Sequence, residues 1–233
     1  MKSYIDFVNK HTNEIAFVVG AGTSLLEVYN SPLLEHIHNH VVVSVNSSFI
    51  MMPWAGGSPE KRYWISNDAL CRRWNWWPLV KKSACNKIVR DSWKPHFHEI
   101  PDFHTFHIRP TSEGIINPDD TGLAYCSSVP SGIDLCIQMG CKCIYLLGVD
   151  QYMIGEKSHF WQYLPKEKQP RRIDFMMAPH KQQKDAFKYN DMAYPALKKF
   201  AEIKNVTIYN CNPSSRVEVF DKISFTDAID DIG

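Results

Sequence analysis

The sequence predicts an α/β domain built on a largely parallel sheet with helices on both faces. Short apolar runs rich in β-branched residues alternate along the chain with segments of helical spacing. Strands separated by helices usually lie parallel, because each crossover returns the chain to the same edge of the sheet. The 233 residues, 44% of them hydrophobic, suffice for one sizeable core, so we expect a single domain over 1–233.

The first half of the chain is expected to supply most of the strands. Residues 24–40, after the first apolar run, have helical spacing that is interrupted at Pro32. The runs interpreted as strands are 15–20, 41–46 and 62–68, with weaker candidates at 86–93 and 105–110.

The second half is expected to alternate helices with strands. Residues 130–140 have helical spacing and end in a glycine, and the apolar run 141–150 follows as a buried strand. A mostly amphipathic helix at 182–205 and a last strand at 206–213 complete the predicted sheet.

Residues 153–181 have little periodicity and are rich in aromatic and basic side chains, among them Arg171 and Arg172. Loops of this length in a compact domain are usually lids or disordered segments, and the aromatic residues argue against disorder, so we expect a lid insertion that covers a substrate. His180 closes this segment at the entry to the next helix, where a base that titrates near neutrality would be useful. A lone histidine is, however, more often a polar surface residue.

The first predicted strand runs into a glycine-containing turn, Gly20-Ala-Gly22-Thr23-Ser24. Such a turn offers backbone N–H groups and a helix N-terminus to an anion, so it favours a nucleotide or phosphate contact. The alternative is a tight strand-to-helix turn with a hydroxyl cap. Leu26 stands where a dinucleotide fingerprint needs its third glycine, and no Gly-Lys-Ser/Thr follows, so neither an NAD site nor a Walker loop is indicated.

Small or hydrogen-bonding residues also follow the other predicted strands. In a parallel sheet the carboxyl ends of the strands meet at one edge, where ligands bind, so we expect these residues to converge. Amides at such positions either recognise a base edge or a sugar hydroxyl, or merely cap turns. A helix start at Ser131-Gly132 would add a second anion site. The candidates are Asn46, Asn67, Asp68, Ser131, Gly132, Asp150 and Tyr152.

Other clusters are interpreted as structural. The histidines at 36, 38 and 40 and at 96, 98, 104 and 107 lack a carboxylate or cysteine at a zinc-site spacing, so we expect no metal. Cys141 and Cys143 are interpreted as a buried strand pair. The tryptophan-rich segment 72–80 is either an interaction surface, an acceptor platform or core packing.

Composition narrows the class of protein. A net charge of +1 gives no sign of nucleic-acid binding. No apolar run approaches the ~20 residues of a membrane helix, and the first 15 residues lack the apolar core of a signal peptide. The seven cysteines are interpreted as reduced thiols of a cytoplasmic protein. The oligomeric state stays open, a homo-oligomer included.

In this order, the motifs resemble one family: the bacterial sialyltransferases that modify lipooligosaccharide, with a related uncharacterised domain family of flagellin-modifying and phage proteins. That family opens with a strand, Gly-x-Gly-x-Ser-Leu and a helix, as at 20–25. Its central signature, Ser-Gly, a helix, and a buried strand ending Gly-Ile-Asp-x-Tyr, resembles 131–152. A histidine before the last long helix matches His180, and Cys-x-Pro-x-Ser matches 211–215. The resemblance spans roughly 14–220.

The resemblance implies a Rossmann-like (GT-A-like) nucleotide-binding fold with a small lid. It also implies transfer of a nine-carbon acidic sugar from a CMP-activated donor to a glycan or glycoconjugate acceptor, with no metal and no cofactor beyond the donor. The glycine turn, Asn46, Asn67 and Ser131-Gly132 would hold the donor. Tyr152 would contact the departing phosphate, and His180 would be the general base.

Two positions depart from the family pattern. The family arginine before Ser-Gly is absent, and residues 126–130 read Cys-Ser-Ser-Val-Pro instead. The second lid tyrosine is displaced, with Ser158-His159-Phe160 near its place. His159 or a basic lid residue would then contact the phosphate.

Two other functions stay open beside a glycosyltransferase. A relative of the same domain family transfers pyrophosphate to a hydroxymethylpterin, which would require magnesium and an acidic ligand set from Asp68 and Asp150. The second is a non-catalytic nucleotide-binding protein, of phage origin or used in assembly, that kept the fold.

Overall fold

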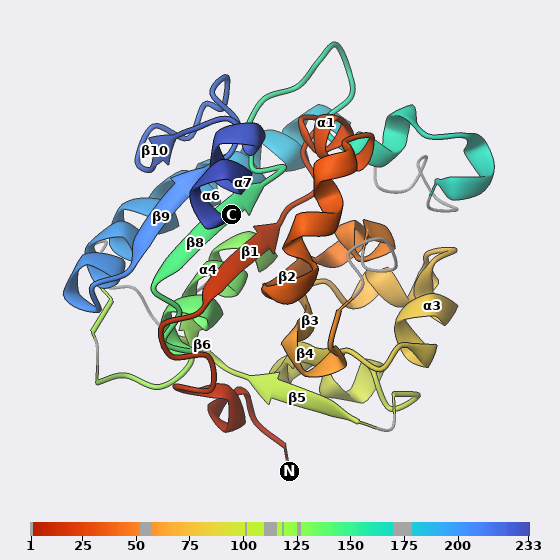
Figure 1. Cartoon of the computed structure of the whole chain (residues 1–233). Coiled ribbons are helices and arrows are strands. Elements are labelled where there is room, and N and C mark those ends of the chain that lie inside the picture. Colours follow the sequence, from red (N-terminus) through yellow and green to blue (C-terminus); the bar gives the residue numbers. More distant parts are fainter. Residues whose placement is uncertain are drawn as a thin grey trace.

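The computed structural model describes residues 2–51, 57–100, 102–109, 116–117, 119–124, 127–169 and 179–233, without the side chains of 51 and 179–186. Eight strands form one sheet in the order β10-β9-β8-β1-β2-β3-β4-β5, and every neighbouring pair is parallel (Figure 1). The predicted α/β class with a largely parallel sheet is therefore confirmed.

The strands lie inside or close to the predicted runs. A second, two-stranded parallel sheet, β6 with β7, was not predicted, and neither was the edge strand β10. The strands are β1 (Ile15–Val19), β2 (Val41–Val45), β3 (Arg62–Ser66), β4 (Asn86–Arg90), β5 (Phe103–Phe106), β6 (Ile108–Arg109), β7 (Leu123–Ala124), β8 (Cys143–Leu147), β9 (Thr207–Asn210) and β10 (Asp221–Lys222).

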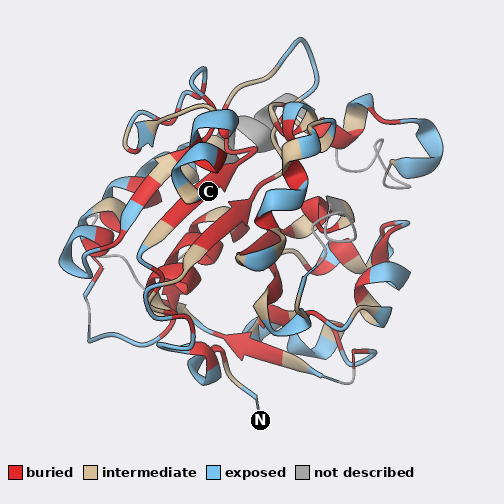
Figure 2. Ribbon diagram, in the orientation of Figure 1, coloured by how far each residue is buried: buried red, intermediate tan, exposed pale blue. Residues whose placement is uncertain are grey.

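Two apolar layers cover the sheet, because alternate residues of each strand point to opposite faces. Val18 of β1 packs in the layer that holds α4 (Ser128–Gln138) and α6 (Pro179–Ile203). Phe17 packs in the opposite layer, with α1 (Leu25–Tyr29), α3 (Trp77–Lys82) and α7 (Phe225–Ile232). The central strands are accordingly buried along their length (Figure 2).

Short 3-10 helices make up much of the remaining chain, and they account for the main difference from prediction. Residues 24–40 form the short α1 and then the 3-10 helix η2, because Pro32 starts a new element that Ser31 caps through the Leu33 N–H (3.1 Å). The 3-10 helices are η1 (Tyr4–Phe7), η2 (Pro32–Asn39), η3 (Asn46–Met51), η4 (Pro59–Lys61), η5 (Ala69–Arg73), η6 (Asp91–His96), η7 (Phe160–Tyr163) and η8 (Lys166–Lys168).

The helix expected at 130–140 begins two residues earlier, and Gly140 follows it with φ +82°, the conformation that ends many helices. The tryptophan-rich segment belongs to the core: Trp74, Trp76 and Trp77 are all buried in the layer beside α3. Within the described residues, no helix is both long and apolar enough to cross a membrane.

The predicted lid is described only in part, since 170–178, with Arg171 and Arg172, lie outside the described residues. Its first part is anchored rather than loose. Phe160 and Trp161 of η7 are buried in the core, and the Phe160 N–H donates to Ala21 O in the glycine turn (3.0 Å).

Candidate functional site at the carboxyl ends of the strands

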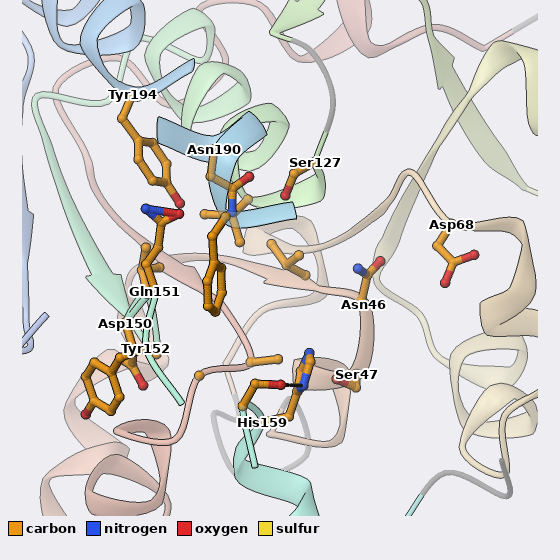
Figure 3. Close-up of a pocket in the computed structure, with 18 of the residues that line it drawn as sticks. Asn46, Ser47, Asp68, Ser127, Asp150, Gln151, Tyr152, His159, Asn190 and Tyr194 are labelled. Carbon is orange, nitrogen blue, oxygen red and sulfur yellow. Dashed lines mark hydrogen bonds between the residues drawn. The ribbon is translucent and has the colours of Figure 1, made fainter. Parts of the chain in front are cut away.

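A cavity of about 210 Å³ lies where the carboxyl ends of β1, β2, β3 and β8 meet (Figure 3). From β1 the chain moves outward to β5 and then returns to β8 on the other side of β1. Such a reversal of strand order opens a crevice, the usual ligand site in sheets of this kind. The lining residues are Ala21, Gly22, Val45, Asn46, Ser47, Asp68, Trp74, Ser127, Val129, Gly148, Val149, Asp150, Gln151, Tyr152, Ser158, His159, Phe187, Asn190 and Tyr194.

The glycine turn faces this cavity, but Asp150 accepts hydrogen bonds from the two hydroxyl groups of the turn and from the backbone N–H of Ser24, the residue before α1. Asp150 Oδ2 accepts the Ser24 N–H (2.8 Å) and the Thr23 hydroxyl (3.3 Å). Asp150 Oδ1 accepts the Ser24 hydroxyl and Asn212 Nδ2 (2.9 Å for the latter). Asp150 thus stands where a bound anion was expected, and the turn contributes Ala21 and Gly22 to the cavity.

The two glycines of the turn are needed because β8 approaches it closely. A Cβ on Gly20 would lie 2.5 Å from Gly148 O, and a Cβ on Gly22 would lie 2.5 Å from Asp150 Oδ2. Both distances are far shorter than van der Waals contact, so a side chain at either position would force the strand ends apart. The glycines therefore have a packing role whether or not the turn also touches a ligand.

Asn46 and Asp68 both line the cavity. Asn46 begins η3 with φ +52°, and its Oδ1 accepts the Ser128 hydroxyl (3.2 Å). The Nδ2 of Asn46 makes no hydrogen bond with a described residue and points toward the cavity in Figure 3. Asp68 caps η5 by accepting the Leu70 N–H (2.8 Å), and burial raises the pKa of its carboxyl group.

Asn67, Ser131 and Gly132 lie behind the cavity rather than in its lining. The Asn67 amide donates to Ser131 Oγ (3.0 Å), and that hydroxyl donates to Ala124 O (2.7 Å). A Cβ on Gly132 would contact valines of β1 and β2 at 3.3–3.5 Å, so this glycine lets α4 lie close to the sheet. Ser127, which precedes α4, faces the cavity instead.

Tyr152 and His159 both line the cavity, and Figure 3 shows Tyr152 beside Asp150. Asn212 Nδ2 contacts the Tyr152 hydroxyl at 3.5 Å. The His159 Nδ1 lies 2.7 Å from Ser158 Oγ, and desolvation lowers the pKa of His159 to about 4. The ring is therefore neutral at pH 7, and when Ser158 donates to Nδ1 its proton resides on Nε2.

The polar residues of the cavity wall that were not predicted from the sequence include Gln151, Asn190 and Tyr194. Gln151 stands at the variable position of the motif, between Asp150 and Tyr152, so the motif gives it no role. Asn190 and Tyr194 lie on α6. Their spacing from Phe187 predicts an amphipathic helix but does not predict that its side chains line a ligand site. Their position in the wall depends on how α6 packs against α4 and β9.

His180 lies in the first turn of α6, and its side chain is outside the described residues. Seven-residue spacing relates it to Phe187 and then to Tyr194, so the three positions share one face of the helix. In the described part of the chain, no three His, Cys, Asp or Glu side chains are grouped closely enough to hold a metal ion.

Comparisons with known proteins identify the fold. No protein-family model matches the sequence, and a search of curated proteins finds no match. The structure is similar to the MAf glycosyltransferase from Magnetospirillum magneticum AMB-1, with a TM-score of 0.57 and 14% identity. The match covers 95% of this chain but 37% of the other, so the chain spans well under half of that protein.

Two sialyltransferase structures are also similar. The first is a variant of the sialyltransferase CstII in complex with CMP: TM-score 0.51, 15% identity, 89% of this chain and 85% of that one. The second is CstII from Campylobacter jejuni in complex with the substrate analogue CMP-3FNeuAc: TM-score 0.51, 14% identity, 91% and 86%. At these identities the similarity shows that the chain has an α/β fold found in glycosyltransferases.

Proposed function

We propose that this chain is a glycosyltransferase that moves an acidic, sialic-acid-like sugar from a CMP-activated donor to an acceptor hydroxyl. The observation that carries the proposal is the position of the polar cavity at the switch point between β1 and β8. The fold that surrounds it is shared with sialyltransferase structures that hold CMP or a CMP-sugar analogue. The acceptor would be a glycan or glycoconjugate.

The nucleotide would occupy the end of the cavity at Asn46, across from Gln151 and Tyr194 (Figure 3). The Asn46 Nδ2, which makes no hydrogen bond with a described residue, supplies a hydrogen-bond donor there, and Trp74 in the cavity wall supplies an aromatic surface for a base. The glycine turn would contact the phosphate or ribose through Ala21 and Gly22, because the Ser24 donors are already used by Asp150.

The transfer forms a bond between the acceptor oxygen and the anomeric carbon and breaks the bond from that carbon to the phosphate oxygen. The bonding electrons leave with CMP, and the acceptor proton goes to a base. His180 is the proposed base. The assignment is supported by its position on the same face of α6 as Phe187 and Tyr194, which line the cavity. No metal ion is required in this scheme.

The departing phosphate needs hydrogen-bond donors, since the arginine of the resembled family is missing. Tyr152 and His159 are the proposed partners, because both line the cavity beside the turn. A neutral His159 with its proton on Nε2 would donate one hydrogen bond without adding a charge. His159 would in this way take part of the role of the missing arginine.

The pyrophosphokinase alternative receives no support from the placement of its two candidate ligands. Both carboxylate oxygens of Asp150 already accept hydrogen bonds from the chain. Asp68 caps η5, and Figure 3 shows it across the cavity from Asp150.

A nucleotide panel tests the proposal. CMP, CDP, UDP, GDP and ATP are each added to the protein with and without magnesium, and thermal unfolding is recorded. We expect stabilisation by CMP that saturates and does not depend on magnesium, because a ligand of the folded state raises its apparent stability. Stabilisation by ATP that depends on magnesium would favour the pyrophosphokinase, and no response to any nucleotide would contradict both enzymes.

A further inference from the structure

Three polar atoms in the wall of the cavity have no partner within the described part of the chain. They are Gln151 Oε1, Asn190 Oδ1 and the Tyr194 hydroxyl. Gln151 is 8% exposed and Tyr194 is 2% exposed, so water does not replace the missing partners easily. Figure 3 shows all three side chains directed into one end of the cavity. Buried polar atoms left without partners are costly, and a ligand that pairs with them recovers that cost.

The orientation of Gln151 is set by a neighbour on α6. Its Nε2 donates to Asp191 Oδ1, which leaves Oε1 as the atom that faces the cavity. Asp191 only accepts when ionised, so the opposite orientation of the amide would place two acceptors together. Gln151 itself has φ +54°, a conformation that costs energy for a residue other than glycine.

The chemistry of these atoms determines what they can bind. Gln151 Oε1 and Asn190 Oδ1 accept hydrogen bonds, and Tyr194 both donates and accepts. Burial, with the Asp191 carboxylate nearby, raises the pKa of Tyr194, so the phenol stays protonated. A carboxylate or phosphate would meet two acceptor oxygens and lie close to Asp191. The wall therefore suits an uncharged group that carries hydroxyl or amide N–H donors.

We propose that Gln151, Asn190 and Tyr194 form a subsite for the uncharged, hydroxyl-bearing and N–H-bearing arm of the donor sugar, with Asp191 as the residue that positions Gln151. This inference rests on the proposed function. Gln151 directly precedes Tyr152, the proposed phosphate partner, and α6 also carries the proposed base. The nucleotide end, at Asn46, lies across the cavity (Figure 3).

The test compares two probes by calorimetry: CMP, which lacks the sugar, and the analogue CMP-3FNeuAc, which carries it. Tyr194→Phe removes only the hydroxyl, and Tyr189→Phe, at a 46% exposed position of α6, is the matched control. We expect Tyr194→Phe to weaken binding of the analogue by about three- to ten-fold, the effect of one lost hydrogen bond. Affinity for CMP should change less than twofold, and the control should match the wild type for both probes.

Asp191→Ala tests whether Asp191 positions Gln151. In this variant Gln151 should lose its fixed orientation, and the protein should bind CMP-3FNeuAc more weakly. Restored affinity in Asp191→Glu would support a role through the carboxylate. Equal weakening of CMP and the analogue, or unchanged analogue affinity in both Tyr194→Phe and Asp191→Ala, would overturn the subsite. A wild-type protein that binds neither probe would overturn the proposed function itself, which is a different result.

Discussion

Asp150 shows how a single residue changes the meaning of a motif. A strand followed by Gly-x-Gly-Thr-Ser is typical of an anion site, yet here the anion at the helix start is a side chain of β8's own end. Asp150 is 3% exposed and accepts four hydrogen bonds from Thr23, Ser24 and Asn212. It joins three strand ends at the floor of the cavity, so its removal should loosen the site as a whole.

Asp150→Asn should lower the free energy of unfolding by about 1–3 kcal/mol, because the new amide N–H₂ faces donors where an acceptor oxygen stood. Urea denaturation measures the change. Asp230→Asn, at an exposed position of α7, is the control and should stay within about 0.5 kcal/mol of the wild type. Equal stability of the two variants would show that the Asp150 hydrogen bonds contribute little.

His180→Ala tests the proposed base. The variant should bind CMP as the wild type does but release CMP from a CMP-sialic acid donor about 10²–10⁴ times more slowly in the presence of an acceptor glycan. His36→Ala, exposed on η2, is the matched histidine control. Full turnover in His180→Ala would remove His180 from the mechanism.

His159 makes stability depend on pH. Its pKa is lowered to about 4 in the folded chain, against about 6.5 for an unperturbed histidine. The unfolded chain therefore binds the proton first, and stability should fall as the pH drops from about 6.5 toward about 4. We expect the advantage of the wild type over His159→Asn to shrink by about 1–3 kcal/mol between pH 7 and pH 4.5. Parallel pH profiles of the two proteins would show that His159 keeps an ordinary pKa.

At the level of elements, η7 joins the lid segment to the site. Trp161 is 1% exposed in the core, whereas Tyr163, in the same element, is 38% exposed and packs under Lys157. The Phe160 N–H also donates a hydrogen bond to Ala21 O of the glycine turn (3.0 Å). Packing of η7 and the shape of the cavity are therefore coupled.

Trp161→Ala should cost about 3–5 kcal/mol of unfolding free energy, as for other large buried side chains, and should also weaken nucleotide binding. Tyr163→Ala should cost about 1 kcal/mol or less and leave binding unchanged. Chemical denaturation and a CMP titration of both variants measure these effects. A small loss in Trp161→Ala would mean that η7 is not anchored as described.

Elements differed in how well the sequence predicted them. The strands 15–20, 41–46 and 62–68 were recognised because continuous apolar runs are typical of strands buried on both faces. The sequences of the 3-10 helices have no distinctive periodicity. As a result η3 was not predicted, and η2 was predicted as part of one helical segment with α1. The strands β7 and β10 are two residues long, too short for any pattern, and β6, of the same length, lies inside the candidate run 105–110.

For the whole molecule, the alternation of predicted strands and helices predicted the fold class. The polar residues that follow the strands predicted the edge of the sheet at which the cavity lies. The sequence did not separate residues that face the cavity, such as Asn46, from residues one layer behind it, such as Ser131. That distinction depends on how closely α4 packs against β1 and β2 at Gly132. The sequence does not predict that Gln151, Asn190 and Tyr194 lie together, because their shared position arises from tertiary packing.

A calorimetric titration of the protein with CMP in the absence of magnesium tests the proposed function most directly. We expect saturable binding of one CMP per chain. We also expect weaker binding by Asn46→Ala, which removes the Nδ2 donor from the nucleotide end of the cavity, and unchanged binding by His36→Ala. Absence of a saturable signal, or equal affinity of Asn46→Ala and wild type, would contradict the assignment of this cavity to a CMP-activated donor.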